Sequence, residues 1–416
     1  MTAAAIEVEP ACPGGLPTAP SPTPAEPHHR LVAIRRPFAS VDAATWDALA
    51  GRNPWATPFA RWAFHRSWWD AYGATAHDET MVVVDPDLGP DAEPVGIVPL
   101  MHRHEVEPSD ALEQTTLRHR SGPALTPVPP TAKAIFFGAS YHADYATALT
   151  APDQLEAVAA AVVETLAAGP PADGSHPEPW DVVDLRRLRC GDPTAAALSA
   201  AFERRAAEQD WTVDLEREDV CPVATIPADV VDLDGFLATL GKKERHEIRR
   251  KVRRAEAAGE VILAPSLEPL EDLEAFIDLH QRRWGEAGLF PQTPGGEASR
   301  RFLRGLFERF GPEGPVRLCF LTVGGRRIAA GITFEYGDTV AYYNAGTDPD
   351  ARALSPGVLL IAKYVERAIA TGRHRLDFLR GDEPYKYEWG AVDEPIQRLL
   401  VRRNASDESG PMTAVR

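Results

Sequence analysis

The segment LDFLRGDEPYKYEWG, residues 376–390, concentrates the side chains that are best suited to chemistry. It reads as a strand that ends at a turn near Gly381 and continues into a run of ionisable and aromatic residues. A cation that aromatic residues fix at the end of a strand can stabilise negative charge as it develops on an oxygen atom. We therefore expect Lys386 to be catalytic, with Tyr385 beside it. A surface loop with a solvated lysine is the alternative interpretation.

The run AGTDPDARALSPGVLLI, residues 345–361, is the second candidate for chemistry. We expect a helix to begin here, with Ser355 as the N-cap, Pro356 in the first helical position and Gly357 in the second. The N–H groups and the positive dipole end at such a helix start suit a phosphate group, and a glycine leaves room for close approach. The alternative is a well-capped helix that binds no ligand.

A basic segment, Gly241 to Arg254, stands out because the whole chain carries a net charge of −17. The segment contains eight Lys or Arg residues and two Glu residues, a formal charge of +6, which indicates an anionic partner. Helical spacing gives it a buried stripe of Leu240, Ile248, Val252 and Ala255 and a basic face of Lys242, Arg245, Arg249 and Arg253. We expect this face to contact an anionic acceptor or cofactor phosphates, or to bridge two domains. A solvated helix face is the alternative.

The length of 416 residues suggests two or three domains, and the acidic balance disfavours DNA as a partner. We expect disorder in the Pro- and Ala-rich residues 1–30 and in the polar tail, residues 406–416. The chain has no apolar run of about 18 residues, no signal-peptide pattern at its N-terminus, and no C-x-x-C spacing among its four Cys. These features predict a cytoplasmic protein with no membrane span, no disulfide framework and no bound metal.

The two halves of the chain repeat one order of elements. In the first half we expect a helix at 62–72, strands at 81–84 and 95–100, a helix at 154–168 and a strand at 180–185. In the second half we expect helices at 273–284 and 301–310, strands at 316–323, 328–336 and 339–345, a helix at 357–370 and a strand at 375–379. The last strand of each half also carries a D-x-x-R sequence, Asp184 with Arg187 and Asp377 with Arg380, which indicates a duplication. This order predicts the α+β fold class, with two domains at residues 31–225 and 226–405, each a mixed, mostly antiparallel sheet flanked by helices.

Residues 236–390 resemble the CelD-like (cellulose-biosynthesis type) acetyltransferases of the GNAT superfamily, which are relatives of the Fem-type peptidoglycan aminoacyltransferases. The resemblance rests on the stretches KKERHEIRRKVRRAEAAG, HQRRWGEAG, LSPGVLLIAKYVERAIATG and LDFLRGDEPYKYEWG, and on ATPFARWAFHRSWWDAYG nearer the N-terminus. It implies two tandem GNAT-like domains, of which the second holds the donor site and the first is a degenerate partner that shapes the acceptor cleft. It also implies that acetyl-CoA or another acyl-CoA is the co-substrate.

The same resemblance implies that the pyrophosphate of coenzyme A lies at the predicted helix start. We assign cofactor binding there to five residues, Arg352, Ser355, Gly357, Val358 and Leu359. The sequence departs from the GNAT pattern Q/R-x-x-G-x-G/A, because Arg352 and Gly357 have a different spacing and fewer glycines are present. Lys386 corresponds to the lysine of the Fem-type F-K-x-x-F-G ending, which faces the reacting carbonyl or phosphate.

Several carboxylates are candidates for the residue that accepts the proton of the acceptor amine. A nearby carboxylate or a bridging water can take the proton that an amine loses during acyl transfer, which leaves Asp382, Glu388 and Glu335 as candidates. We expect Asp377 to pair with Arg380 instead. On the acceptor side we assign substrate binding to Arg245, Arg249, Trp284, Tyr343 and Asn344.

Together these features predict an N-acyltransferase that uses an acyl-CoA and acts on an amine-bearing metabolite or a cell-envelope precursor, by direct attack in a ternary complex. Two alternatives remain open. The first is an aminoacyl-tRNA-dependent transferase of Fem type, which the basic segment favours. The second is a catalytically inactive GNAT pair that acts as a binding protein, which the departure from the glycine pattern favours.

Overall fold

The computed structural model describes residues 30–89, 92–103, 125–129, 131–140, 142–169 and 179–404. The two segments for which the sequence predicts disorder lie outside these ranges, apart from Arg30. Within the described ranges, no helix combines the length and the apolar character that a membrane crossing requires.

The first half alternates short strands with four helices in the part of the chain that is described. Its strands are β1 (Val32–Arg35), β2 (His77–Asp78), β3 (Met81–Val84), β4 (Gly96–Val98), β5 (Leu100–Arg103), β6 (Ala134–Phe137), β7 (Leu149–Thr150), β8 (Val182–Arg189) and β9 (Trp211–Thr225). Its helices are α1 (Ala43–Arg52), α2 (Trp62–Tyr72), α3 (Leu155–Ala168) and α4 (Pro193–Gln209). Local signals set these bounds: Asp192 caps α4 by accepting a hydrogen bond from the backbone N–H of Thr194, and Pro193 follows in the first turn.

The second half begins with two helices and then builds a four-stranded antiparallel block. Its elements are α5 (Leu233–Thr239), α6 (Lys242–Ala258), β10 (Val261–Pro265), α7 (Pro269–Trp284), α8 (Pro294–Phe310), β11 (Val316–Val323), β12 (Arg326–Tyr336), β13 (Thr339–Thr347), α9 (Pro356–Ala370), β14 (Arg375–Asp377), α10 (Pro384–Tyr387) and β15 (Val392–Arg403). A short 3-10 helix, Pro349–Leu354, leads from β13 into α9.

One sheet runs through both halves. Its strands follow the order β10-β11-β12-β13-β14-β9-β15-β8-β6-β5-β2. Neighbouring strands are antiparallel except in two pairs, β13–β14 and β6–β8, which are parallel. A second sheet of four strands, β1-β3-β4-β7, lies in the first half. The predicted α+β class with a mixed, mostly antiparallel sheet is confirmed.

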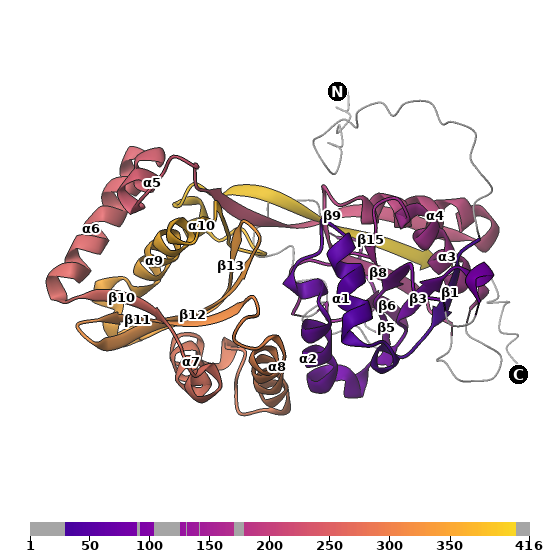
Figure 1. Cartoon of the computed structure of the whole chain (residues 1–416), viewed down its shortest axis with the longest axis horizontal. Coiled ribbons are helices and arrows are strands. Elements are labelled where there is room, and N and C mark those ends of the chain that lie inside the picture. Colours follow the sequence, from indigo (N-terminus) through magenta and orange to yellow (C-terminus); the bar gives the residue numbers. More distant parts are fainter. Residues whose placement is uncertain are drawn as a thin grey trace, which may run out of the picture.

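The two long strands β9 and β15 join the halves (Figure 1). β9 pairs with β14 through residues 223–225 and with β15 through residues 211–223. β15 comes last in the sequence, yet it lies between β9 and β8 and so completes the sheet of the first half. The predicted boundary near residue 225 therefore does not separate two independent sheets.

Side chains alternate between two cores along the strands of the second half. On β11, Leu318 and Phe320 face the core that α7 and α8 cover, whereas Cys319 and Leu321 face the core that α5, α6 and α9 cover. The first of these cores also contains the fully buried Trp68 of α2, because α2 lies beside α8 (Figure 1). The halves thus share a hydrophobic core, which fixes their relative position.

Candidate active site

The strands β13 and β14 separate after a short parallel ladder. They pair only through Thr339 to Ala341 and Arg375 to Asp377, although β13 continues to pair with β12 as far as Thr347. Beyond Asp377 the chain follows β9 instead, since Phe378 donates its backbone N–H to the Pro222 carbonyl at 3.0 Å. The two strands therefore open a gap in the sheet. A β-bulge at the same level leaves Tyr343 without a register partner on β12.

A pocket with a volume of about 710 Å³ fills this gap. Its walls come from β13, from the segment after β14, from α7 and from the first turn of α9. α7 approaches β13 closely because Gly346 has no side chain: a Cβ atom there would lie 2.4 Å from the backbone nitrogen of His280. The size is within the range of small-molecule and cofactor sites.

The start of α9 lies at this pocket through Gly357 and Val358. Ser355 does not cap the helix with its side chain as predicted, because its backbone is in the left-handed region (φ 57°) and its hydroxyl makes no capping hydrogen bond. Its Oγ accepts a hydrogen bond of 2.7 Å from Nη2 of Arg254 on α6 instead. A Cβ atom on Gly357 would meet nothing within 4 Å. The tip of α9 is thus open, with an arginine beside it.

Lys386 lies in the same pocket, where its side chain is almost fully buried. Its Nζ donates to the carbonyl oxygens of Leu379 (2.9 Å), Arg380 (2.9 Å) and Gly381 (2.7 Å). The Glu383 carboxylate lies 3.0 Å from the same nitrogen. An ammonium group has three protons, so all of them are already donated to the backbone of the segment that follows β14.

Most of the predicted catalytic and acceptor-side residues line the pocket, and some do not. Those that line it are Lys386, Tyr385, Glu388, Trp284, Tyr343 and Asn344, together with Gly357 and Val358 of the predicted cofactor site. Those that are not part of its lining are Asp382, Arg352, Ser355, Leu359, Arg245 and Arg249. The buried Leu359 packs in the core, and Arg245 and Arg249 turn toward α5, where Arg249 pairs with Asp234 at 2.8 Å.

Two carboxylates have partners that the sequence did not predict. Asp377 does not pair with Arg380: its Oδ2 accepts a hydrogen bond of 2.8 Å from the Tyr145 hydroxyl, and its Oδ1 accepts one of 2.8 Å from the backbone N–H of Leu379. Glu335 is held by Arg367 at 2.5 Å and does not line the pocket. Burial raises the pKa of Asp377 to about 6, although both hydrogen bonds act in the opposite direction.

The first half contributes pocket residues that sequence reasoning missed. His142 and Asp144 come from the loop between β6 and β7, and Asp219 comes from β9. Asp144 pairs with Arg380 across the pocket wall at 3.5 Å. No local motif marks these residues, because they reach the second half only through the packing of α2 on α8 and the shared strand β9.

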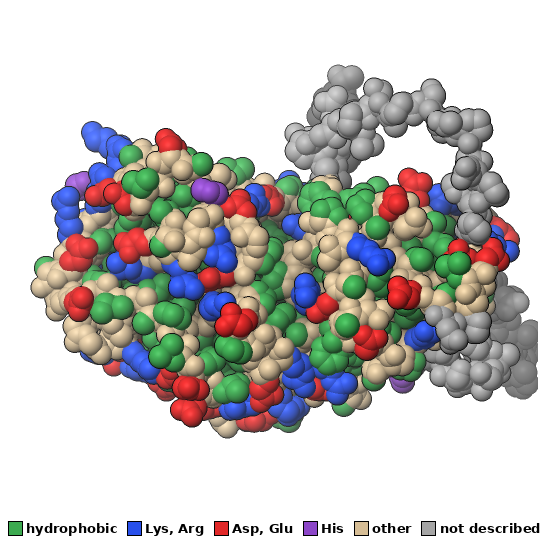
Figure 2. Space-filling model, in the orientation of Figure 1, with side chains coloured by type: hydrophobic (Ala, Val, Ile, Leu, Met, Phe, Trp, Pro, Cys, Tyr) green, Lys and Arg blue, Asp and Glu red, His purple; other side chains and the backbone are tan. Residues whose placement is uncertain are grey.

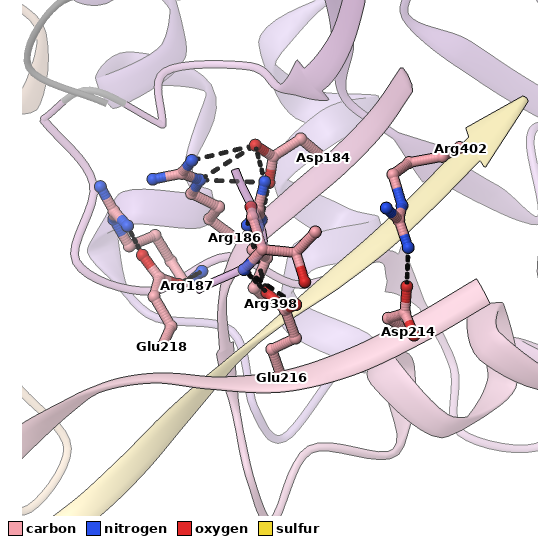
Figure 3. Close-up of polar contacts among 9 residues, drawn as sticks. Asp184, Arg186, Arg187, Asp214, Glu216, Glu218, Arg398 and Arg402 are labelled. Atoms are coloured by element: carbon pink, nitrogen blue, oxygen red, sulfur yellow. Dashed lines mark hydrogen bonds and ion pairs between the residues drawn. The ribbon is translucent and has the colours of Figure 1, made fainter. Parts of the chain in front are cut away.

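In the described part of the first half, the chain bridges the corresponding gap between two parallel strands. The parallel pair β6–β8 also ends early, at Ile135 and Val183, but Ala146 returns to bridge Leu188 on β8. Directly after Val183, the buried Asp184 forms ion pairs (Figure 3). Its carboxylate accepts hydrogen bonds from Nε (2.7 Å) and Nη2 (2.8 Å) of Arg398 on β15. Among the described residues, the place where β6 and β8 separate is thus bridged by Ala146 and lies next to buried ion pairs.

The sequence predicts no disulfide framework among the four cysteines, and one of them departs from this expectation. Cys221 and Cys319 are buried free thiols, but Cys190 is disulfide-bonded. Among the described residues there is no group of three or more His, Cys, Asp or Glu side chains placed to hold a metal ion.

Residues 242–387, which include α6, the open gap and Lys386, match the sequence model of a family described as an acetyltransferase (GNAT) domain. The second half therefore contains a GNAT domain. The match lies within the predicted second domain, residues 226–405. No curated protein matches the chain.

Solved structures extend the similarity beyond the GNAT domain. The crystal structure of FemX has a TM-score of 0.51 at 12% identity, over 86% of this chain and 96% of that one. A conserved protein of unknown function from Bacteroides thetaiotaomicron VPI-5482 has a TM-score of 0.49 at 14% identity, over 88% and 98%. A tandem GNAT protein from the clavulanic acid biosynthesis pathway has a TM-score of 0.45 at 11% identity, over 91% and 100%. At these identities the likeness to FemX concerns the fold alone.

Proposed function

We propose that this protein is an acyl-CoA-dependent N-acyltransferase of the CelD-like group, with acetyl-CoA as the most suitable donor. One observation carries the proposal: β13 and β14 separate beside the open start of α9, and a pocket fills the gap between them. Separated strands offer backbone N–H and C=O groups to an extended ligand, as an exposed sheet edge does to a peptide. The pantetheine arm of coenzyme A is such a ligand, since it carries two amide groups.

The phosphates of the donor belong at the tip of α9. Gly357 and Val358 supply an uncrowded helix start, whose dipole favours an anion. Arg254 lies beside this tip through its hydrogen bond to Ser355, so the basic helix α6 adds a positive charge at the same place. The sequence lacks the glycine-rich pattern that binds the pyrophosphate in GNAT proteins. In this proposal the positive charge of Arg254 attracts the pyrophosphate instead.

The chemistry is direct transfer. The lone pair of the acceptor amine attacks the thioester carbonyl carbon, the C–N bond forms, and the C–S bond breaks as coenzyme A leaves as a thiolate. The amine loses one proton to Glu388 or to a water in the pocket, and a proton returns to the thiolate. Both substrates must be held together for this step, which is the main contribution of the pocket.

Lys386 acts by positioning in this proposal. Its three protons hold the carbonyl groups of residues 379–381, which form one wall of the gap. Direct donation to the developing oxyanion would require Lys386 to give up one of these bonds, which is costly for a buried group. In this proposal Lys386 therefore does not contact the reacting carbonyl group directly. It holds in place the backbone segment, residues 379–381, that contacts the donor.

Binding of acetyl-CoA, measured by calorimetry and by the rise in melting temperature, tests the proposal. S-acetylpantetheine, which lacks the phosphates at the α9 tip, is the matched control and should bind much more weakly. Mass spectrometry after incubation with acetyl-CoA and ethanolamine, glucosamine, lysine or spermidine should detect an acetylated amine. Failure to bind acetyl-CoA would rule out the proposal.

A second candidate function is aminoacyl transfer from tRNA, and the exposed charge of α6 favours it. Lys242, Lys243, Arg250, Arg253 and Arg254 are exposed along this helix, and Figure 2 shows basic side chains projecting at the end of the molecule where α5 and α6 lie. For Arg245 and Arg249 to contact the tRNA as well, their side chains would have to leave their partners on α5. A tRNA gel shift that weakens steeply between low and high salt would support this candidate.

A further inference from the structure

Most of the cationic side chains that line the pocket are paired with a carboxylate. Lys386 lies 3.0 Å from Glu383, and Arg380 lies 3.5 Å from Asp144. Arg283, in the last turn of α7, also lines the pocket. No carboxylate among the described residues forms an ion pair with it. Arg283 therefore brings to the pocket a positive charge that the described part of the protein does not neutralise.

The neighbouring arginine of α7 has the opposite arrangement. Arg282 pairs with Asp348 at 2.7 Å and with Asp350 at 2.9 Å, and it is not part of the pocket lining. Consecutive residues of a helix point in different directions, so these two carboxylates reach Arg282 and not Arg283. The unpaired charge is thus a property of position 283, and not of this end of α7 in general.

Two contacts hold the Arg283 side chain at the pocket without neutralising it. Its Nη1 donates a hydrogen bond of 3.2 Å to Oγ1 of Thr347, and its guanidinium carbon lies 4.9 Å from the centre of the Trp284 ring. Thr347 and Trp284 line the same pocket. A guanidinium group has five N–H donors, so this one has others to offer to a ligand. Two of them on neighbouring nitrogens can bind both oxygens of a carboxylate.

The charge of Arg283 acts on other groups of the pocket lining. Burial, and then the nearby Tyr385, raise the pKa of Tyr342, and Arg283 acts in the opposite direction. Burial lowers the pKa of His280 to about 4; the hydrogen bond with Gln281 opposes this effect, and Arg283 adds to it. An anionic group that enters the pocket is attracted by the same charge.

The acceptor is the substrate that this charge suits. In the proposed function, the phosphates of the donor lie at the tip of α9 beside Arg254, which leaves the cation on α7 for the second substrate. The exposed Glu388 lines the pocket as well and is the proposed proton acceptor for the amine. The pocket thus offers a carboxylate to an amine and a guanidinium group to an anion of the same molecule.

We propose that the acceptor is an amine that also carries a carboxylate, and that Arg283 binds this carboxylate through two of its N–H groups. The inference rests on the proposed acyltransferase function and names the class of its acceptor. Amino acids are the simplest compounds that carry both groups. The carboxylate takes no part in the reaction. Its binding fixes the acceptor at a second point, which holds the amine nitrogen in place for attack on the thioester.

Pairs of amines that differ by one carboxylate test the inference. L-serine and ethanolamine form one pair, and L-lysine and cadaverine form another. In each pair we expect kcat/KM for the member with the carboxylate to be about tenfold higher or more, the effect of one charge-assisted contact. O-phosphoethanolamine offers a phosphate in place of the carboxylate and should be a poorer substrate than L-serine.

Variants of the two neighbouring arginines assign the effect to one side chain. Arg283→Gln should raise the KM for L-serine and L-lysine about tenfold, with the KM for ethanolamine, cadaverine and acetyl-CoA within about twofold of the wild type. Arg283→Lys keeps the charge but not the fork, so it should restore only part of the preference. Arg282→Gln is the matched control and should keep the wild-type preference. Arg283 is exposed, so we expect its variants to fold, which their melting temperatures check.

Equal kcat/KM values within both pairs, or an unchanged preference in Arg283→Gln, would overturn the inference. A loss of acetyl-CoA affinity in Arg283→Gln would also overturn it, because Arg283 would then bind the donor. A preference for O-phosphoethanolamine over L-serine would contradict the assignment of a carboxylate. Calorimetry with the same amines and no donor gives the comparison without turnover. Failure of the wild type to bind acetyl-CoA counts against the proposed function, whereas the donor-free comparison tests Arg283 alone.

Discussion

Tyr145 of the first half donates a hydrogen bond of 2.8 Å to Oδ2 of Asp377 in the second half. Asp377 is the last residue of β14 that pairs with β13, so this bond lies at the base of the gap that forms the pocket. The other carboxylate oxygen holds the backbone of Leu379, whose φ of 56° begins the segment that Lys386 fixes. The contact between the halves and the shape of the pocket wall therefore depend on one buried carboxyl group.

This arrangement makes stability depend on pH. The pKa of Asp377 is raised from 3.8 to about 6 by burial, so between about pH 4 and pH 6 the folded chain keeps a proton that the unfolded chain releases. As the pH rises from 4 to 6, the free energy of unfolding of the wild type should therefore fall relative to that of Asp377→Asn, by on the order of 3 kcal/mol. Urea denaturation at several pH values measures it. Asp229→Asn, at an exposed position, should keep the wild-type profile, and a flat difference for Asp377→Asn would contradict the assignment.

Lys386→Met should destabilise the fold as well as reduce activity. The change leaves three carbonyl groups without their donor, which we expect to lower the free energy of unfolding by roughly 3 kcal/mol and acetyl transfer by more than about tenfold. Denaturation and kinetics, both well below the melting temperature, measure the two effects. Lys363→Met removes a lysine on α9 that pairs with Glu366 near the surface and should change neither quantity appreciably. Full stability in Lys386→Met would show that the carbonyl contacts contribute little.

Gly357→Glu should weaken donor binding without harming the fold. A side chain fits at this position, since a Cβ atom would meet nothing within 4 Å, but a carboxylate there repels the phosphates that the α9 tip attracts. We expect the affinity for acetyl-CoA in calorimetry to fall about tenfold or more. Gly357→Ala is the matched control and should bind as the wild type does. Equal affinity in both variants would place the phosphates elsewhere.

Arg254→Gln should weaken acetyl-CoA binding about threefold to tenfold, because it removes the cation next to Ser355. The remaining affinity should depend less on ionic strength than that of the wild type, since one charge contact with phosphate is gone. Arg250→Gln changes a cation on the same helix that pairs with Glu247, and serves as the control. The same loss of affinity in both variants would indicate a general charge effect of α6 and not a specific contact.

The sequence located most regular elements of the second half. Strand β11 at Val316–Val323 has the predicted bounds, and α9 at Pro356–Ala370 begins with Pro356 in the predicted first helical position. The buried stripe predicted for α6 also exists, with Ile248 and Ala255 buried and Leu240 and Val252 packed against the same core. Hydrophobic periodicity and turn residues are local, so they fix such features without knowledge of distant contacts.

The sequence by itself determined the order of the elements, the helix start at Pro356 and the cluster around Lys386, because each depends on neighbours along the chain. Only the tertiary structure decided that β15 returns to the first half, that Lys386 holds backbone carbonyls, and that His142 reaches the pocket of the second half. Those outcomes depend on which strands pair and how α2 packs on α8. Such contacts join residues far apart in sequence, and local patterns do not specify them.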